Sequence, residues 1–363
     1  MKFFLAGVLM VATVFSATGK GIDSLDLKIG QMIMIGIGER TTLTQSDSLR
    51  AELAAGKLSG VVLFEKNLAG TATADNLRSL IKALQQEALQ PLFISIDEEG
   101  GKVHRLKEKY GFFALPTAAH LGRLDNPDST LYYNRKLAML LKELRFNVNY
   151  APSVDMAVNP RNTVIVTAER SFSRSASSVA KHAALCIQAH REHGVATVLK
   201  HFPGHGSSNT DSHFGLVDVT NTWKREELRP YDTLIQAGFA DAVMVAHIIN
   251  RNWDNSMLPA TLSQRVVGGM LRKDLGFKGV VFSDDMQMKA IADHYGLERA
   301  IVLAINAGVD VLMFANTIPD AAHRVSPSQI HDAIKKLVLK GTISPKQIDE
   351  SYKRIVLLKG KYP

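Results

Sequence analysis

The chain has 363 residues, of which 46% are hydrophobic and 21% charged, an ordinary balance for a globular protein with a sizeable core. Its formal net charge is +8, but the basic residues are scattered rather than gathered in a stripe, which argues against nucleic-acid binding. The single cysteine, Cys186, excludes an intrachain disulfide, and we expect it to be a small hydrophobic residue of the core.

Residues 1–19 have the layout of a secretory signal peptide. Lys2 precedes an apolar segment, and the small residues of 16–19 follow it. The apolar segment is too short for a comfortable transmembrane helix. We therefore expect a cleaved signal, an exported (periplasmic or secreted) protein and no stable membrane insertion after cleavage. An uncleaved anchor is the alternative. Residues 20–363 would then form one domain.

Eight short runs along the chain have the character of strands. They are residues 31–37, 58–64, 91–97, 146–155, 195–202, 242–248, 279–285 and 309–315. Most are nearly continuous apolar runs rather than clean alternations, which is typical of parallel strands that are buried on both faces.

Amphipathic segments lie between these runs. In residues 263–276, for example, Val266, Val267, Met270 and Leu271 make one apolar stripe, with Ser263 as a candidate N-cap. Strand followed by helix eight times predicts an α/β fold, a TIM (β/α)8 barrel, with residues 326–363 as helices packed on the outside. A doubly wound sheet is the structural alternative, but it needs fewer strands and usually a glycine-rich first turn.

Five of the runs end in ionisable residues after apolar interiors. These residues are Asp97, Asp155, Lys200 with His201, His247, and Asp284 with Asp285. In TIM barrels the chemistry gathers at the C-terminal ends of the strands, so these endings predict a common pocket.

The loop of residues 97–106 reads DEEGGKVHRL. Its two glycines allow a tight turn that would bring Arg105 back toward Asp97. This pair could grip neighbouring hydroxyls of a polar ligand or could form a surface ion pair, and these residues alone leave both open. Glu169 and Arg170, after the fourth run, could likewise clamp a ligand or lie in an ordinary loop.

Residues 200–213, KHFPGHGSSNTDSH, place a cation, three histidines and a carboxylate in one glycine-rich loop. Asp211 stands two residues from His213. A carboxylate at that spacing can fix the tautomer of an imidazole and raise its basicity, which would give a proton-transfer group near neutral pH.

The two aspartates at the end of the seventh run alternate in direction. Asp284 shares a side with Val280 and Phe282, whereas Asp285 shares the other side with Val281. We expect only one of the two carboxylates to face the pocket, and the alternation alone does not say which. The other would support the site or cap the next helix, predicted to begin near Met286.

Together these motifs resemble glycoside hydrolase family 3, in its single-domain β-N-acetylglucosaminidase (NagZ-like) branch. The resemblance runs from about residue 27 to 312 and rests on the segments at 97–105, 149–155, 169–172, 200–206, 211–213, 246–248 and 276–286. The Asp-x-His element at 211–213 is the most specific of them, and the order and spacing of all of them strengthen the match.

The resemblance implies a retaining hydrolysis of terminal β-N-acetylglucosamine, with peptidoglycan fragments or related glycans as the carbohydrate partner and no cofactor or metal. It implies that Asp284 is the nucleophile and that His213, oriented by Asp211, is the acid/base. It places five further residues around the hydroxyls of the sugar: Asp97, Arg105, Arg170, Lys200 and His201. It also implies that Asp155 supports this network, that His205 shapes the loop, and that the Phe202–Pro203 peptide is cis.

The chain departs from the commoner family pattern at Glu98, where glutamine is usual, and at Lys102, where arginine is usual. The loop before Asp211 also differs. These departures concern substrate preference and loop mobility and leave the reaction class unaltered.

Three other functions are compatible with parts of this pattern. A metallohydrolase would use His201, His205, Asp211 and His213 as ligands, but it would also want ligands after the first and eighth strands. A non-catalytic sugar-binding protein would lack a catalytic group, whereas Asp211, His213 and Asp284 are all present. A β-glucosidase-like hydrolase or an N-acetylglucosaminide phosphorylase of the same family is the nearest alternative. The sequence does not indicate the oligomeric state.

Overall fold

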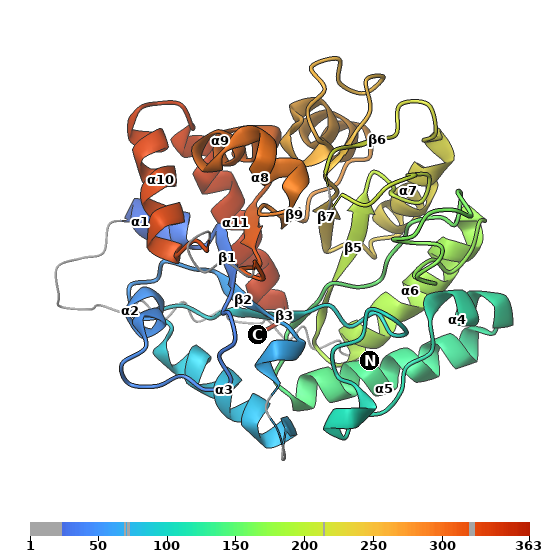
Figure 1. The fold of residues 1–363 in the computed structure, drawn as a ribbon, viewed down its shortest axis with the longest axis horizontal. Coiled ribbons are helices and arrows are strands. Elements are labelled where there is room, and N and C mark those ends of the chain that lie inside the picture. Colours follow the sequence, from blue (N-terminus) through green and yellow to red (C-terminus); the bar gives the residue numbers. More distant parts are fainter. Residues whose placement is uncertain (1–23, 69, 71–72, 213–214, 319–323) are drawn as a thin grey trace, which may run out of the picture.

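A computed structural model describes residues 24–68, 70, 73–212, 215–318 and 324–363. The predicted signal peptide lies outside the described residues. Eight parallel strands close into a barrel in the order β1-β10-β9-β7-β5-β4-β3-β2, surrounded by helices (Figure 1). The predicted TIM barrel is therefore confirmed.

Each barrel strand falls within one of the eight predicted runs. The strands are β1 (Ile33–Gly36), β2 (Gly60–Leu63), β3 (Phe93–Ile96), β4 (Val148–Asn149), β5 (Ala196–Phe202), β7 (Ala242–Val245), β9 (Val280–Asp285) and β10 (Val311–Phe314). Strands β6 (Val217–Asp218) and β8 (Ile248–Ile249) pair separately as a small parallel sheet. β4 is much shorter than its predicted run, and Pro152, which has no amide hydrogen to donate, follows soon after it.

The α-helices lie before, between and after the barrel strands along the chain, in places two in succession. They are α1 (Ser24–Gly30), α2 (Ser48–Ala54), α3 (Thr73–Glu87), α4 (Ala118–Leu124), α5 (Pro127–Glu143), α6 (Ala176–Glu192), α7 (Arg229–Gln236), α8 (Lys289–Tyr295), α9 (Leu297–Ala307), α10 (Pro327–Leu339) and α11 (Pro345–Lys361). Short 3-10 turns are η1 (Glu65–Asn67), η2 (Glu108–Tyr110), η3 (Arg225–Leu228) and η4 (Ala260–Leu262). Within the described residues, no helix combines the length and the apolar character needed to cross a membrane.

The helix predicted within 263–276 spans Arg265–Asp274 and is wound as a π-helix, η5. Val266, Val267 and Leu271 of the predicted stripe are buried against the barrel. Ser263 Oγ accepts a hydrogen bond from the amide of Val266 at 3.3 Å, so its side chain satisfies an amide of the first turn, as expected of a capping residue.

The barrel interior is filled by large side chains. The ring of Phe282 packs edge-on against Phe93 and Tyr150, with centroids 5.9 Å away in each case. Cys186 is buried in α6, as predicted for a core residue. The barrel is thus a packed core, and a ligand can enter only at one of its ends.

Helix α11 lies at the N-terminal end of the barrel, in agreement with the predicted outer helices at the C-terminus. The ammonium group of Lys359 donates to Gln31 Oε1 at 2.5 Å, to the Ser59 carbonyl at 2.8 Å and to the Pro91 carbonyl at 2.6 Å. These contacts attach α11 to the segments that precede β1, β2 and β3.

Candidate active site

A cavity of about 210 Å³ opens at the C-terminal ends of the barrel strands. Its ionisable lining residues are Asp97, Arg105, Arg170, Lys200, His201, His205, Asp284 and Asp285. A larger cavity of about 770 Å³ lies at the N-terminal end, but of the described side chains that line it none is a histidine and only Glu143 is acidic. Chemistry rather than size therefore singles out the smaller cavity.

Lys200, near the end of β5, holds two carboxylates at the base of this cavity. Its Nζ lies 2.6 Å from Asp97 Oδ1 and 2.6 Å from Glu99 Oε1, and its side chain is only 1% exposed. Two carboxylates of the loop after β3 and a lysine far along the chain are thereby brought together in a site with little water, where their interactions are strong.

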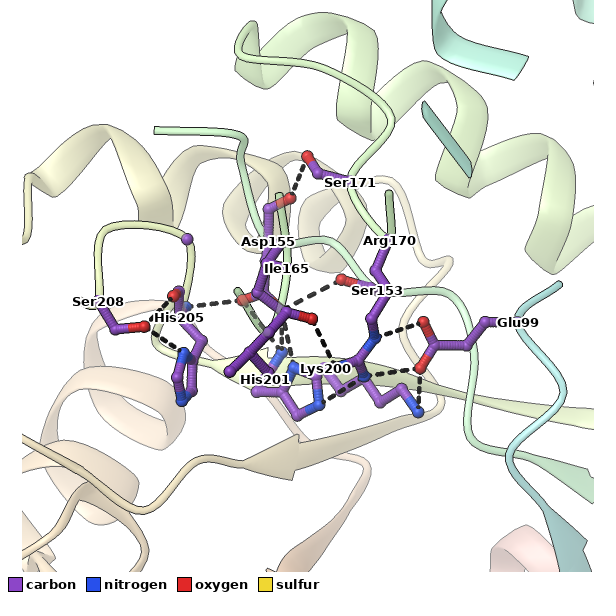
Figure 2. A network of polar contacts seen from close by, with 12 residues as sticks. Glu99, Ser153, Asp155, Ile165, Arg170, Ser171, Lys200, His201, His205 and Ser208 are labelled. Carbon is purple, nitrogen blue, oxygen red and sulfur yellow. Dashed lines mark hydrogen bonds and ion pairs between the residues drawn. The ribbon is translucent and has the colours of Figure 1, made fainter. Parts of the chain in front are cut away.

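Arg170 completes this group from the loop after β4. Its guanidinium donates to both carboxylate oxygens of Glu99, at 2.7 and 2.9 Å, in the forked geometry that favours arginine (Figure 2). Burial would raise the pKa of Glu99, but Arg170 and Lys200 outweigh burial and hold it well below its usual range. Glu99 is therefore ionised and belongs to the electrostatic frame of the pocket.

The ring of His201 is held by protein groups on both sides. Arg170 Nη2 donates to its Nε2 at 3.1 Å, and a guanidinium cannot accept, so Nε2 carries no hydrogen. The hydrogen then lies on Nδ1, which donates to Asp155 Oδ2 at 2.7 Å. Although His201 lines the cavity, both of its ring nitrogens are engaged, so it acts on a ligand chiefly through Arg170.

Asp155 is buried and organises the chain after β5 (Figure 2). Besides the His201 ring, it accepts hydrogen bonds from Ser153 Oγ at 3.1 Å and from the amide of His205 at 2.7 Å. Burial would raise the pKa of Asp155, but its interactions with His201 and His205 outweigh burial and lower the pKa to about 2. This is the supporting position that the sequence comparison implied.

His205 is a buried residue whose ring contacts two serines of its own loop, the one that follows β5. Its Nδ1 lies 2.8 Å from Ser208 Oγ, and its Nε2 lies 3.4 Å from Ser212 Oγ. Burial and the neighbouring His201 lower the pKa of His205 to about 4, so it is neutral at neutral pH. The Phe202–Pro203 peptide that leads to this loop is cis, as implied by the resemblance.

The two aspartates at the end of β9 both line the cavity, so the expectation that only one could face it was too strict. The pairing of β9 with β10 is irregular here, and strict alternation is lost near the rim of the barrel. Asp284 continues the interior face of Phe282, and its Oδ1 accepts from the amide of Asp285 at 2.8 Å. Asp285 Oδ1 accepts from the amides of Gln287 and Ala315, each at 3.0 Å, so this carboxylate also holds the following turn.

The predicted acid/base residue, His213, lies outside the described residues. Asp211 and Ser212 are described, and Ser212 lines the cavity. The described part of the Asp-x-His loop therefore reaches the pocket.

Two other residues that the sequence singled out lie apart from the cavity wall. His247 is buried, with Nδ1 2.9 Å from Thr261 Oγ1 and Nε2 3.0 Å from the Asp285 carbonyl, so it supports the backbone beneath the aspartates. Glu169 pairs with Arg123 at 3.1 Å on the surface, unlike its neighbour Arg170. Glu169 therefore lies in an ordinary surface loop, whereas Arg170 lines the cavity.

Arg105 approaches Asp97 as the glycine turn predicted, with Nη2 3.8 Å from Asp97 Oδ2. Sequence reasoning missed Glu99, although it stands in the same motif. Its position could have identified it, because Glu99 directly precedes the glycine pair in the loop that carries both Asp97 and Arg105.

Within the described part of the chain, no group of three or more His, Cys, Asp or Glu residues is arranged to hold a metal ion.

The chain matches a known protein family over nearly all of its described length. Residues 24–358 match the model described as the glycosyl hydrolase family 3 N terminal domain. The chain belongs to glycosyl hydrolase family 3. Asp97, Lys200 and Asp284 all lie within the matched residues.

Relatives within glycosyl hydrolase family 3 have related names. The chain is 34% identical over 283 residues to a β-hexosaminidase of Idiomarina loihiensis, covering 76% of this chain and 81% of the relative. It is 32% identical over 327 residues to β-hexosaminidase A of Pseudoalteromonas piscicida, covering 84% of this chain. The match spans about half of that longer relative, 54%.

Solved structures of the family have the same fold. A glycoside hydrolase family 3 β-N-acetylglucosaminidase from Paenibacillus superimposes with a TM-score of 0.84 at 34% identity, over 93% of this chain and 62% of that one. A β-N-acetylhexosaminidase from Beutenbergia cavernae gives a TM-score of 0.80 at 28% identity, over 94% of this chain and 100% of that one.

Proposed function

We propose that this chain is a retaining exo-β-N-acetylhexosaminidase that removes terminal β-N-acetylglucosamine from peptidoglycan fragments or related glycans. The observation that carries the proposal is the position of Asp284 in the wall of a small cavity that Asp97, Lys200 and Arg170 also line, with Glu99 paired to the last two. The names of the relatives support the class of sugar.

In the first step Asp284 attacks the anomeric carbon while the bond from that carbon to the leaving oxygen breaks. His213, oriented by Asp211, gives its proton to that oxygen. In the second step a water molecule gives a proton to His213 and attacks the same carbon, which releases Asp284. Two inversions retain the β configuration.

The sugar hydroxyls are bound by charged groups that are already in place. Asp97 can only accept hydrogen bonds and Arg105 can only donate them, so the pair recognises neighbouring hydroxyls in one orientation. The cavity, about 210 Å³, is smaller than the roughly 300–1,000 Å³ that suit drug-sized ligands. This size supports the removal of one terminal sugar at a time.

A panel of aryl β-glycosides that differ only in the C2 substituent tests this proposal. The N-acetylglucosaminide should be cleaved far faster than the glucoside, and Asp284→Asn should lack the activity. Preference for the glucoside would overturn the assignment of the sugar. A sugar 1-phosphate formed in phosphate buffer would instead identify a phosphorylase.

We also propose that the chain is exported, because residues 1–19 combine a basic start, an apolar segment and small residues. N-terminal sequencing of the protein from its native cells should find a start near Ser16 or Gly19. A start at Met1 would contradict cleavage.

A further inference from the structure

Glu98 departs from the usual family pattern, and its side chain is completely buried beside the cavity loop. Its Oε2 accepts hydrogen bonds from two consecutive amides, that of Arg105 at 2.8 Å and that of Leu106 at 3.0 Å. Its Oε1 is in contact with His104 Nδ1. One carboxylate thus holds three consecutive residues of the loop that follows β3.

Among the described residues, the side chain of Arg105 has only weak contacts of its own. Its Nη2 is 3.8 Å from Asp97 Oδ2, which is too long for a hydrogen bond, and its guanidinium carbon lies 6.0 Å from the centre of the Phe64 ring. Its Nε is buried and finds no acceptor among the described residues. The place of this guanidinium in the cavity wall therefore depends on where its backbone is held.

The backbone of Glu98 is anchored independently of its side chain. Its amide donates to Asn149 Oδ1 at 3.0 Å, and its carbonyl accepts from Asn149 Nδ2 at 3.0 Å. Truncation of the Glu98 side chain would therefore free the amides of Arg105 and Leu106 while residue 98 stays attached to β4.

We propose that Glu98 is a positioning residue, which fixes the Arg105 guanidinium over the sugar-binding cavity through the backbone of residues 104–106. The inference rests on the proposed function, because Arg105 is taken to bind the hydroxyls of the sugar. It adds that the affinity of the site is set by a buried carboxylate that never touches the substrate.

The test compares Glu98→Ala, Glu98→Gln, Arg105→Ala and the double variant E98A/R105A on an aryl N-acetyl-β-glucosaminide. E98A should raise KM about 10- to 100-fold with kcat changed little, because it releases two hydrogen bonds to a charged acceptor that act on binding alone. E98Q should restore KM to near the wild-type value, since an amide oxygen can still accept from both amides. E98A should add nothing in the R105A background.

Asp310→Asn is the matched control. Asp310 is also a fully buried carboxylate that accepts from a backbone amide, that of Val281 at 2.8 Å, but it lies outside the cavity wall. D310N should lower the thermal unfolding midpoint without a change in KM. Equal losses from E98A in the wild-type and R105A backgrounds, or an E98A effect on unfolding alone, would overturn the inference. If E98A does not fold, Glu98→Asp replaces it, because its shorter side chain cannot reach both amides.

Crystal structures of E98A and E98Q separate this inference from the proposed function, because they need no turnover. Absence of hexosaminidase activity in the wild type would end the proposed function. The positioning role would still be supported if the Arg105 guanidinium leaves Asp97 in E98A and stays in E98Q. An Arg105 guanidinium that keeps its distance of 3.8 Å from Asp97 in E98A would overturn the positioning role.

Discussion

Lys200 Nζ lies 2.6 Å from Glu99 Oε1, and the two side chains are 1% and 5% exposed. The same nitrogen lies equally close to Asp97, so one cation contacts two carboxylates, and Arg170 is a second cation for Glu99. Buried charges are tolerated only when they are paired, and the removal of one partner leaves the others uncompensated.

Lys200→Met should therefore destabilise the protein and impair sugar binding together. We expect the free energy of unfolding to fall by about 3–5 kcal/mol, the cost of breaking a buried ion pair. The value of kcat/KM should fall at least about 100-fold, because Asp97 loses the cation that holds its carboxylate in place. Urea unfolding and steady-state kinetics measure the two effects.

Lys361→Met is the surface control for this variant. Lys361 also pairs with an aspartate at 2.6 Å, but its side chain is 50% exposed. Its loss should cost no more than about 1 kcal/mol. A K200M variant as stable and as active as K361M would contradict the role given to Lys200.

Asp284 and Asp285 should respond differently to the same change. Asp284→Asn should abolish turnover, because an amide cannot serve as the nucleophile. Asp285→Asn should lose less activity, because its amide oxygen can still accept from Gln287 and Ala315. A 5-fluoro N-acetylglucosaminyl fluoride should trap a covalent adduct, and peptide mass mapping should place the adduct on Asp284. An adduct on Asp285 would reverse the assignment.

The barrel could be predicted because its strands are buried on both faces and read as apolar runs. The positions of Lys200 and Asp97 followed from the same runs, since parallel strands deliver their last residues to one end of a barrel. The partner of Arg170 could not be predicted in this way. Glu99 lies 71 residues away, and only the approach of two loops reveals that these side chains meet.

At the rim of the barrel, the alternation of side chains along a strand no longer predicts which of them face the cavity. Alternation placed Asp284 on the same side as Phe282, but it also predicted that only one of the two aspartates would face the pocket. The shifted register between β9 and β10 removes that restriction. Such irregularities arise from tertiary packing, so the alternation of residues along one strand does not predict them.

His213→Ala should affect substrates according to their leaving groups. A poor leaving group needs protonation, so the value of kcat/KM for its cleavage should fall by about 10²–10⁴-fold, whereas kcat/KM for an activated nitrophenyl substrate should change little. Values of kcat/KM, which report the first step alone, measure this difference for a series of aryl N-acetylglucosaminides when they are plotted against the pKa of the leaving phenol. Equal losses across the series would contradict an acid/base role for His213.

Glu227 should make the stability of the protein depend on pH in an unusual direction. The residue is buried next to the loop after β5, where its Oε2 accepts from the amide of Ser207 at 3.2 Å. Burial outweighs its hydrogen bonds and raises the pKa of Glu227 from 4.5 to about 8. The folded state therefore binds the proton more tightly than the unfolded state does.

The contribution of this carboxyl to stability is fully present below pH 4.5 and is lost as the pH rises through about 8. At ~1.4 kcal/mol per pKa unit, the loss over this range is at most ~5 kcal/mol. Glu227→Gln cannot titrate, so its free energy of unfolding should fall less than that of the wild type between pH 5 and pH 9. Urea unfolding at a series of pH values measures the difference between the two proteins. If that difference stays constant across the series, Glu227 is ionised in the folded protein throughout, and its burial does not control its charge.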